Sequence, residues 1–145
     1  MITYLDASAL VKRYVAEAGS DDVNALVGET TALGTAVISR AEVAAALAKA
    51  ARVKLVTRDA AAAALTAFNG DWEDMIRLQL TEALAARAAG LAWEHGLRGY
   101  DAVHLATALF WHETLDEPVT VATYDRELWK GAKTSGLAVW PSALP

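Results

Sequence analysis

The sequence predicts an α/β fold in which a mainly parallel sheet of short strands is flanked by helices on both faces. Short apolar or β-branched runs alternate with longer helix-like segments along the chain, which is typical of βαβ units. The length of 145 residues suits one domain with its own core. No Gly-, Ser- or Pro-rich stretch divides the chain. We therefore expect one domain over residues 1–145.

Strands and helices already alternate in the N-terminal half. An apolar run at Ile2–Leu5 predicts the first strand, and a β-branched run predicts a second strand at Thr35–Ile38. Helical patterns cover Ser8–Tyr14, Asp21–Val27, a segment that begins at Ser39, and a segment from Arg58 to about Asn69. Each strand is thus followed by helix, as a parallel sheet requires.

The same alternation continues in the C-terminal half. Strands are expected at Met75–Leu80, Val119–Thr123 and Leu137–Trp140, the last just before Pro141. Helices are expected from the capping residue Thr81 to about His95, from Tyr100 to about His112, and over Arg126–Lys133, which Ser135 and Gly136 end.

Composition narrows the class of protein. Apolar residues make up 54% of the chain and cysteine is absent, which excludes thiol catalysis and Cys-based zinc sites. The N-terminus does not resemble a secretory signal, and no apolar stretch is long enough to cross a membrane, so we expect a cytoplasmic protein. The net charge is −5. Any nucleic acid must therefore be held by a local basic patch, a bound metal or a second subunit.

Acidic side chains follow the strands at the edge where such sheets bind ligands. In open parallel sheets the ligand lies outside the carboxyl ends of the strands, where the next helices begin. Asp6 directly follows the first strand, and Asp125 follows a later one. Glu42 lies in the first turn of a helix, and Asp101 begins another. These four carboxylates are therefore candidates for one shared site.

A metal ion would explain such a cluster better than helix capping. Each acid alone has a structural explanation, because Asp and Glu favour helix N-termini; Ser39 and Glu42 even have the spacing of a capping box. Two carboxylates about 4 Å apart, however, repel by roughly 4 kcal/mol at an effective dielectric near 20. A cation between them removes that cost. Oxygen ligands without cysteine favour a hard ion, so we expect Mg²⁺ or Mn²⁺ as the cofactor.

Four segments carry a family resemblance: MITYLDASALVKRY, the Glu of SRAEV, GYDAVHLATA and VATYDRELWKGAKTSGLAVWP. Together they resemble the PIN-domain ribonucleases, and particularly the VapC-type toxins, over essentially the whole chain. The motifs are short, but their order makes the match more specific than any one of them. The resemblance implies a single PIN-like domain and a metal-dependent endoribonuclease that hydrolyses RNA phosphodiester bonds.

The resemblance also implies the members of the site and the partners. It assigns catalysis and metal binding to an acidic tetrad, with two nearby hydroxyls as further catalytic candidates. The tetrad is Asp6, Glu42, Asp101 and Asp125, and the hydroxyls belong to Ser8 and Thr123. Tyr124 stands where we expect the family to vary, so the shape of the pocket stays open. An RNA substrate, a cognate antitoxin protein and a homodimer are the implied partners.

Basic residues near the proposed site are candidates for binding the RNA backbone. Arg98 and Arg126 lie close in sequence to Asp101 and Asp125, so we expect them to contact phosphate. Ion pairing with the adjacent acids is the simpler alternative for either arginine.

Histidine and tryptophan give weaker signals. The three histidines show no H-E-x-x-H spacing, so a zinc site is not expected; His104 is expected to pack in a helix, close enough to orient a site residue. The tryptophans are spread singly along the chain, which favours core or interface packing. Trp111 and Trp129 are the candidates for stacking on bases.

Two other functions fit less well. A non-catalytic PIN-fold module that binds a partner would gain nothing evident from four mutually repelling carboxylates. A phosphotransfer protein that uses Asp6 as nucleophile would need a second Asp two residues later, where this chain has Ser8. Gly-rich phosphate loops are absent, which argues against a nucleotide triphosphatase.

Overall fold

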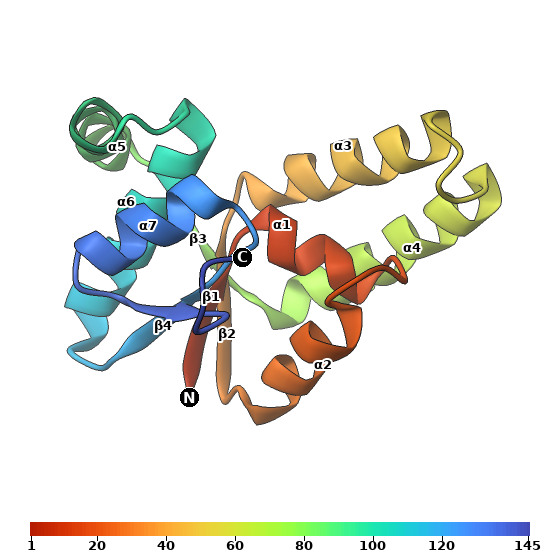
Figure 1. Cartoon of the computed structure of the whole chain (residues 1–145), viewed down its shortest axis with the longest axis horizontal. Coiled ribbons are helices and arrows are strands. Elements are labelled where there is room, and N and C mark those ends of the chain that lie inside the picture. The colour runs from red at the N-terminus through yellow and green to blue at the C-terminus, as the bar shows by residue number, and fades with distance from the viewer.

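The computed structural model describes all residues, 1–145, and contains a five-stranded sheet with helices on both faces (Figure 1). The strands are β1 (Ile2–Leu5), β2 (Ala32–Ala36), β3 (Ile76–Leu78), β4 (Val119–Ala122) and β5 (Ala138–Trp140). Their order is β3-β2-β1-β4-β5, and every neighbouring pair is parallel. The predicted fold class is confirmed.

The helices form two groups on opposite sides of the sheet. The first group is α1 (Ala7–Leu10), the 3₁₀ helix η1 (Val11–Arg13), α2 (Ser20–Glu29), α3 (Ser39–Arg52), α4 (Arg58–Asp71) and the 3₁₀ helix η2 (Trp72–Asp74); the second is α5 (Glu82–His95), α6 (Gly99–Leu115) and α7 (Arg126–Thr134). Figure 1 shows α3 and α4 as a hairpin that extends away from the sheet. None of the helices is long and apolar enough to cross a membrane.

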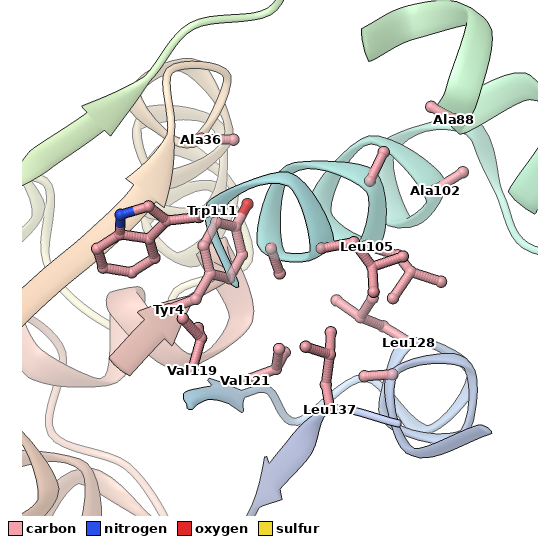
Figure 2. Packing of buried hydrophobic residues seen from close by; sticks show 14 of the residues in the cluster. Tyr4, Ala36, Ala88, Ala102, Leu105, Trp111, Val119, Val121, Leu128 and Leu137 are labelled. Carbon is pink, nitrogen blue, oxygen red and sulfur yellow. The ribbon is translucent and has the colours of Figure 1, made fainter. Parts of the chain in front are cut away.

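Successive residues of the central strands point into two separate cores. Tyr4 of β1 and Val121 of β4 are fully buried against α5, α6 and α7. Their neighbours Leu5 and Ala122 are fully buried against the helices of the first group. Figure 2 shows side chains of the first core, with Leu105 of α6 and other apolar residues between helices and strands. Strands buried on both faces read as continuous apolar runs.

A glycine in β2 allows α6 to approach the sheet closely. A Cβ atom at Gly34 would lie 2.5 Å from the ring of Trp111, which is shorter than any tolerated contact. Trp111 is 4% exposed and belongs to the first core. The indole therefore packs directly on the backbone of β2, and the stacking on bases considered for Trp111 is not supported. Trp129 is also buried, and its Nε1 donates to the carbonyl of Pro141 at 2.8 Å.

Two predicted boundaries are wrong for identifiable reasons. The second strand lies at Ala32–Ala36 instead of Thr35–Ile38, because Ala32 to Gly34 pair with Ile2 to Tyr4 of β1. Pairing with a buried central strand outweighs the low β-propensity of alanine and glycine. The first helix begins at Ala7, since Asp6 is its N-cap, and tightens into η1 after Leu10.

Candidate active site

The four predicted acids lie at the carboxyl ends of the central strands, where helices begin. Asp6 is the N-cap of α1 and Asp125 is the N-cap of α7. Glu42 and Asp101 lie in the first turns of α3 and α6. In Figure 1 these helix starts come together above the sheet, between the two groups of helices.

Asp6 is buried at the centre of this region and is hydrogen-bonded through both carboxylate oxygens. The residue is 3% exposed. Oδ1 accepts from the hydroxyl of Ser8 at 2.7 Å and from the backbone N–H of Ala9 at 3.2 Å. Oδ2 accepts from the hydroxyl of Thr123 at 2.9 Å. Burial raises the pKa of Asp6, while His104 and these three hydrogen bonds oppose the rise.

The two predicted hydroxyls connect the end of β1 to the end of β4. Thr123 Oγ1, besides donating to Asp6, accepts from the backbone N–H of Asp125 at 3.0 Å. Ser8 Oγ likewise accepts from the N–H of Tyr124 at 2.9 Å. The ring of Tyr124 packs edge-on against Trp140, and its hydroxyl reaches the carbonyl oxygen of residue 19 at 3.4 Å. Tyr124 thus shapes the margin of the site while Ser8 and Thr123 orient Asp6.

Arg98 bridges the other two aspartates. Its Nε donates to Asp101 Oδ2 at 3.0 Å and its Nη2 donates to Asp125 Oδ2 at 2.7 Å. Burial, and then the charge of Asp125, raise the pKa of Asp101, and the bond from Arg98 lowers it. Of the two roles considered for Arg98, the structure therefore shows ion pairing with the adjacent acids. Arg126 is exposed and makes no ion pair.

Glu42 is held by a histidine, and the capping-box interpretation is wrong. The N-cap of α3 is Ile38, without any side-chain cap. Glu42 Oε1 instead lies 2.7 Å from His104 Nε2, and His104 Nδ1 lies 2.6 Å from the hydroxyl of Tyr4. A carboxylate only accepts, so Nε2 carries the proton, and in the neutral ring Nδ1 accepts from Tyr4. Burial raises the pKa of Tyr4 well above its usual value and keeps its hydroxyl protonated.

Sequence reasoning missed two buried hydroxyls that hold the start of α3. Thr35 Oγ1 donates to the carbonyl of Leu5 at 2.6 Å, and the hydroxyls of Thr35 and Ser39 are 2.6 Å apart. Both residues are completely buried. This pair ties the end of β1, next to Asp6, to the helix that carries Glu42. The sequence signal that could have revealed this pair is the spacing of Thr35 and Ser39, two hydroxyl residues four positions apart on either side of the end of β2.

The donor atoms suit a hard divalent cation, although a cation would require rearrangement. The side chains are carboxylates and hydroxyls, the ligands that Mg²⁺ and Mn²⁺ prefer. No group of three or more His, Asp or Glu side chains stands close enough together to hold a metal ion. Arg98 occupies oxygens of Asp101 and Asp125, and His104 occupies one of Glu42. Release of these carboxylates would give the cation its ligands.

Hydrogen bonds nevertheless connect three of the four acids in one network. Thr123 links Asp6 to Asp125, and Arg98 links Asp125 to Asp101. Glu42 stays outside this network and is bound by His104, which lies one turn along α6 from Asp101. His104 therefore orients a site residue, as expected from the sequence. The other histidines, His95 and His112, take no part in this network; Nδ1 of His112 accepts from the N–H of Val119.

Known proteins similar to this chain share its sequence pattern and its fold. The PIN domain family model matches residues 3–133. Ribonuclease VapC45 of Mycobacterium tuberculosis is 39% identical over 147 aligned positions, which cover 99% of this chain and 97% of the relative.

Two solved structures show the same fold at low identity. PAE2754 from Pyrobaculum aerophilum has a TM-score of 0.66 at 23% identity, covering 96% of this chain and 83% of that one. A toxin-antitoxin complex from Klebsiella pneumoniae contains a chain with a TM-score of 0.67 at 15% identity, covering 99% of both chains. With the acids at the carboxyl ends of a parallel sheet and a family match across most of its length, this chain belongs to the PIN domain family.

Proposed function

We propose that this chain is a metal-dependent endoribonuclease and the toxin of a toxin–antitoxin pair. The observation that carries the proposal is the hydrogen-bond network that joins Asp6, Asp101 and Asp125 at the carboxyl edge of the sheet, with Glu42 held by His104 one helical turn from Asp101. It occurs in a chain that is 39% identical over nearly its full length to a protein named as a ribonuclease.

The four acids would hold Mg²⁺ or Mn²⁺, with Asp6 and Asp101 as the most direct ligands. The ion would lower the pKa of a water and neutralise charge that develops on the phosphate. Ser8 and Thr123 orient the carboxylate of Asp6 by donating to its two oxygens.

Basic side chains and a buried histidine would complete the machinery. Arg98 and Arg126 are exposed at the edge of the acids and would bind phosphate oxygens of the substrate. His104 fixes Glu42 from the buried side, because it is anchored in turn by Tyr4.

An antitoxin would occupy the apolar groove beside the site. The groove has a volume of about 360 Å³ and lies between η1 and the end of α3. Its lining is mainly apolar and includes Val11, Val15, Val53, Leu55 and Val56. An amphipathic segment with a basic end would fit both this groove and the neighbouring acids. The structural relative from Klebsiella pneumoniae was solved as a toxin-antitoxin complex, which supports an antitoxin as the partner.

A homodimer in the cytoplasm is the expected working form. Trp93 on α5 is 92% exposed, an unfavourable position for an indole in water and a suitable one for a subunit contact. Of the two alternatives for the tryptophans, core packing and interface packing, only the second fits Trp93.

The decisive experiment is RNA cleavage by the purified chain. Structured RNAs would be incubated with Mn²⁺ or with EDTA, beside Asp101→Asn and the matched control Asp116→Asn, which changes an exposed aspartate at the end of α6. We expect Mn²⁺-dependent cleavage that Asp101→Asn abolishes and Asp116→Asn retains. Cleavage that persists in EDTA would refute the metal mechanism. Lack of cleavage by the wild-type chain would favour the non-catalytic partner-binding module.

Growth assays test the toxin assignment separately. Expression of the chain in a bacterial host should slow growth, and co-expression of its neighbouring small open reading frame should restore it. Unimpaired growth with an active, soluble enzyme would remove the toxin assignment and leave the nuclease assignment standing.

A further inference from the structure

The loop end of the α3–α4 hairpin gathers positive charge in a chain whose net charge is −5. Lys49 and Arg52 lie in the last turn of α3, Lys54 in the connecting turn, and Arg58 at the start of α4. All four are exposed and none forms an ion pair. The one acidic residue between residues 49 and 59 is Asp59. We call these four basic residues the hairpin tip.

Helix electrostatics explains two of these four basic residues. Cations near the C-terminus of a helix are favourable, which explains Lys49 and Arg52 in the last turn of α3. The same rule makes Arg58 unfavourable, because it lies at the positive N-terminus of α4. Lys54 lies outside both helices, at a φ of 61°. The repeated positive charge is better explained by a polyanionic ligand.

The hairpin connects this charge to the acidic site at a distance that suits a nucleic-acid strand. Glu42 lies on α3, ten residues before Arg52, so the two are about 15 Å apart along the helix axis. Stacked nucleotides advance by roughly 3.4 Å each, so this distance corresponds to about four nucleotides. Figure 1 shows α3 running from the end of β2 to the loop end of the hairpin.

We propose that the hairpin tip binds backbone phosphates of the RNA substrate about four nucleotides from the bond that is cleaved. The inference rests on the proposed function for the identity of the ligand as RNA. It supplies the local basic patch that an acidic RNA-binding protein requires, and it extends the substrate site along α3. Contacts to phosphate would give affinity without sequence preference.

Binding assays in an inactive background test the tip without relying on cleavage. Asp101→Asn would be combined with Arg52→Ala, Lys54→Ala and Arg58→Ala, and its affinity for fluorescent single-stranded RNAs of 4 and 16 nucleotides measured by anisotropy. The control removes three exposed cations elsewhere, by Arg77→Ala, Lys130→Ala and Lys133→Ala. We expect about tenfold weaker binding of the longer RNA by the tip variant, and a salt dependence lower by about 2 in log–log slope.

The outcomes separate this inference from the proposed function. Equal losses for the tip and control variants, or a tip effect as large for 4 nucleotides as for 16, would overturn it even if the wild type cleaves RNA. No RNA binding by the parent would overturn both. Weaker antitoxin binding with unchanged RNA binding would assign the tip to the protein partner and also overturn it. Circular dichroism verifies that each variant is folded.

A second inference concerns Arg98 and rests on its two bonds at the site. Its guanidinium is positioned between two carboxylates that a divalent cation would also need. Arg98 binds Oδ2 of each aspartate, and Oδ1 of Asp125 accepts from the N–H of Leu128. Asp125 therefore offers a cation no unbound oxygen until the arginine withdraws. We infer that Arg98 and the divalent cation compete for Asp101 and Asp125. Arg98 is 78% exposed in its side chain, so it can turn outward without disrupting the core.

Mn²⁺ binding in the absence of RNA tests this competition. Isothermal titration calorimetry would compare the wild type with Arg98→Ala and with Arg126→Ala, which removes the same charge beside Asp125 but breaks no contact to a carboxylate. We expect the Kd for Mn²⁺ to fall about three- to tenfold in Arg98→Ala, and by less in Arg126→Ala. Equal changes in the two variants would reduce the effect to overall charge and overturn the inference, as would an unchanged Kd in Arg98→Ala. Cleavage assays decide the proposed function independently.

Discussion

The two halves of the acidic site are stabilised in opposite ways. Asp6 is buried and receives three hydrogen bonds from neutral donors that the fold itself supplies. Asp101 and Asp125 lie nearer the surface and share one exposed arginine. The first half is a fixed part of the protein interior, whereas in the second an exposed arginine binds one oxygen of each aspartate, and Asp125 is also held as the N-cap of α7. We therefore expect substitutions in the two halves to affect stability and activity differently.

The largest expected effect is on catalysis, in the Arg98-bridged half. Asp101→Asn should lower the cleavage rate by at least about 100-fold, because a charged ligand is lost from the reacting centre. Far-UV circular dichroism should stay unchanged, since Asp101 is not required for the core. Substantial cleavage by this variant under single-turnover conditions would show that catalysis is confined to the Asp6 half.

In the buried half, removal of a hydroxyl should cost stability. Thr123→Val leaves Asp6 Oδ2 and the N–H of Asp125 without a partner, which should lower the free energy of unfolding by about 2 kcal/mol. Thr120→Val in the same strand is the control, because its hydroxyl makes no side-chain hydrogen bond in the structure, and it should change stability by less than about 0.5 kcal/mol. Urea denaturation measures both. Similar losses of unfolding free energy in the two variants would contradict the idea that the hydrogen bonds to Asp6 stabilise the fold.

The pH dependence of stability should also distinguish Asp6. Its pKa is raised from 3.8 in the folded protein by burial, so between 3.8 and the folded value the folded state binds more protons than the unfolded chain. The free energy of unfolding attributable to Asp6 therefore falls as pH rises through this window and is constant above it. Relative to Asp6→Asn, the wild type should lose stability from about pH 4 upward. A difference that does not vary with pH would refute this.

The smallest of these predicted effects is the loss of stability in Arg98→Ala. Its guanidinium is exposed to solvent, where ion pairs contribute little. The midpoint of urea denaturation should therefore move much less than for Thr123→Val. A shift as large as that of Thr123→Val would show that the bridged half is also part of the fixed interior.

The sequence predicted the parts of the fold and site that depend on local pattern. Alternating strands and helices defined the parallel sheet, and the acids were placed by their positions just after strands or in the first turns of helices. The N-cap roles of Asp6 and Asp125 follow from that same placement.

Contacts between distant segments could not be predicted in this way. Glu42 pairs with His104, which is 62 positions away, and Thr35 reaches the carbonyl of Leu5 across the sheet. The capping-box spacing of Ser39 and Glu42 was misleading, because both side chains bind residues from other elements instead: Ser39 binds Thr35, and Glu42 binds His104. The bridge made by Arg98 to Asp125 likewise needs the register of β4 against β1 to be known.

The absence of a side chain at Gly34 limits how this sequence can diverge. Trp111 rests on that bare stretch of backbone, and it shares a helix with Asp101 and His104. Any larger residue at position 34 would push the C-terminal end of α6 away from the sheet and tilt the helix. Asp101 and His104, near the N-terminal end of α6, would then be displaced. Folded variants should therefore change positions 34 and 111 together: a bulkier residue at 34 should be tolerated when a smaller residue replaces Trp111.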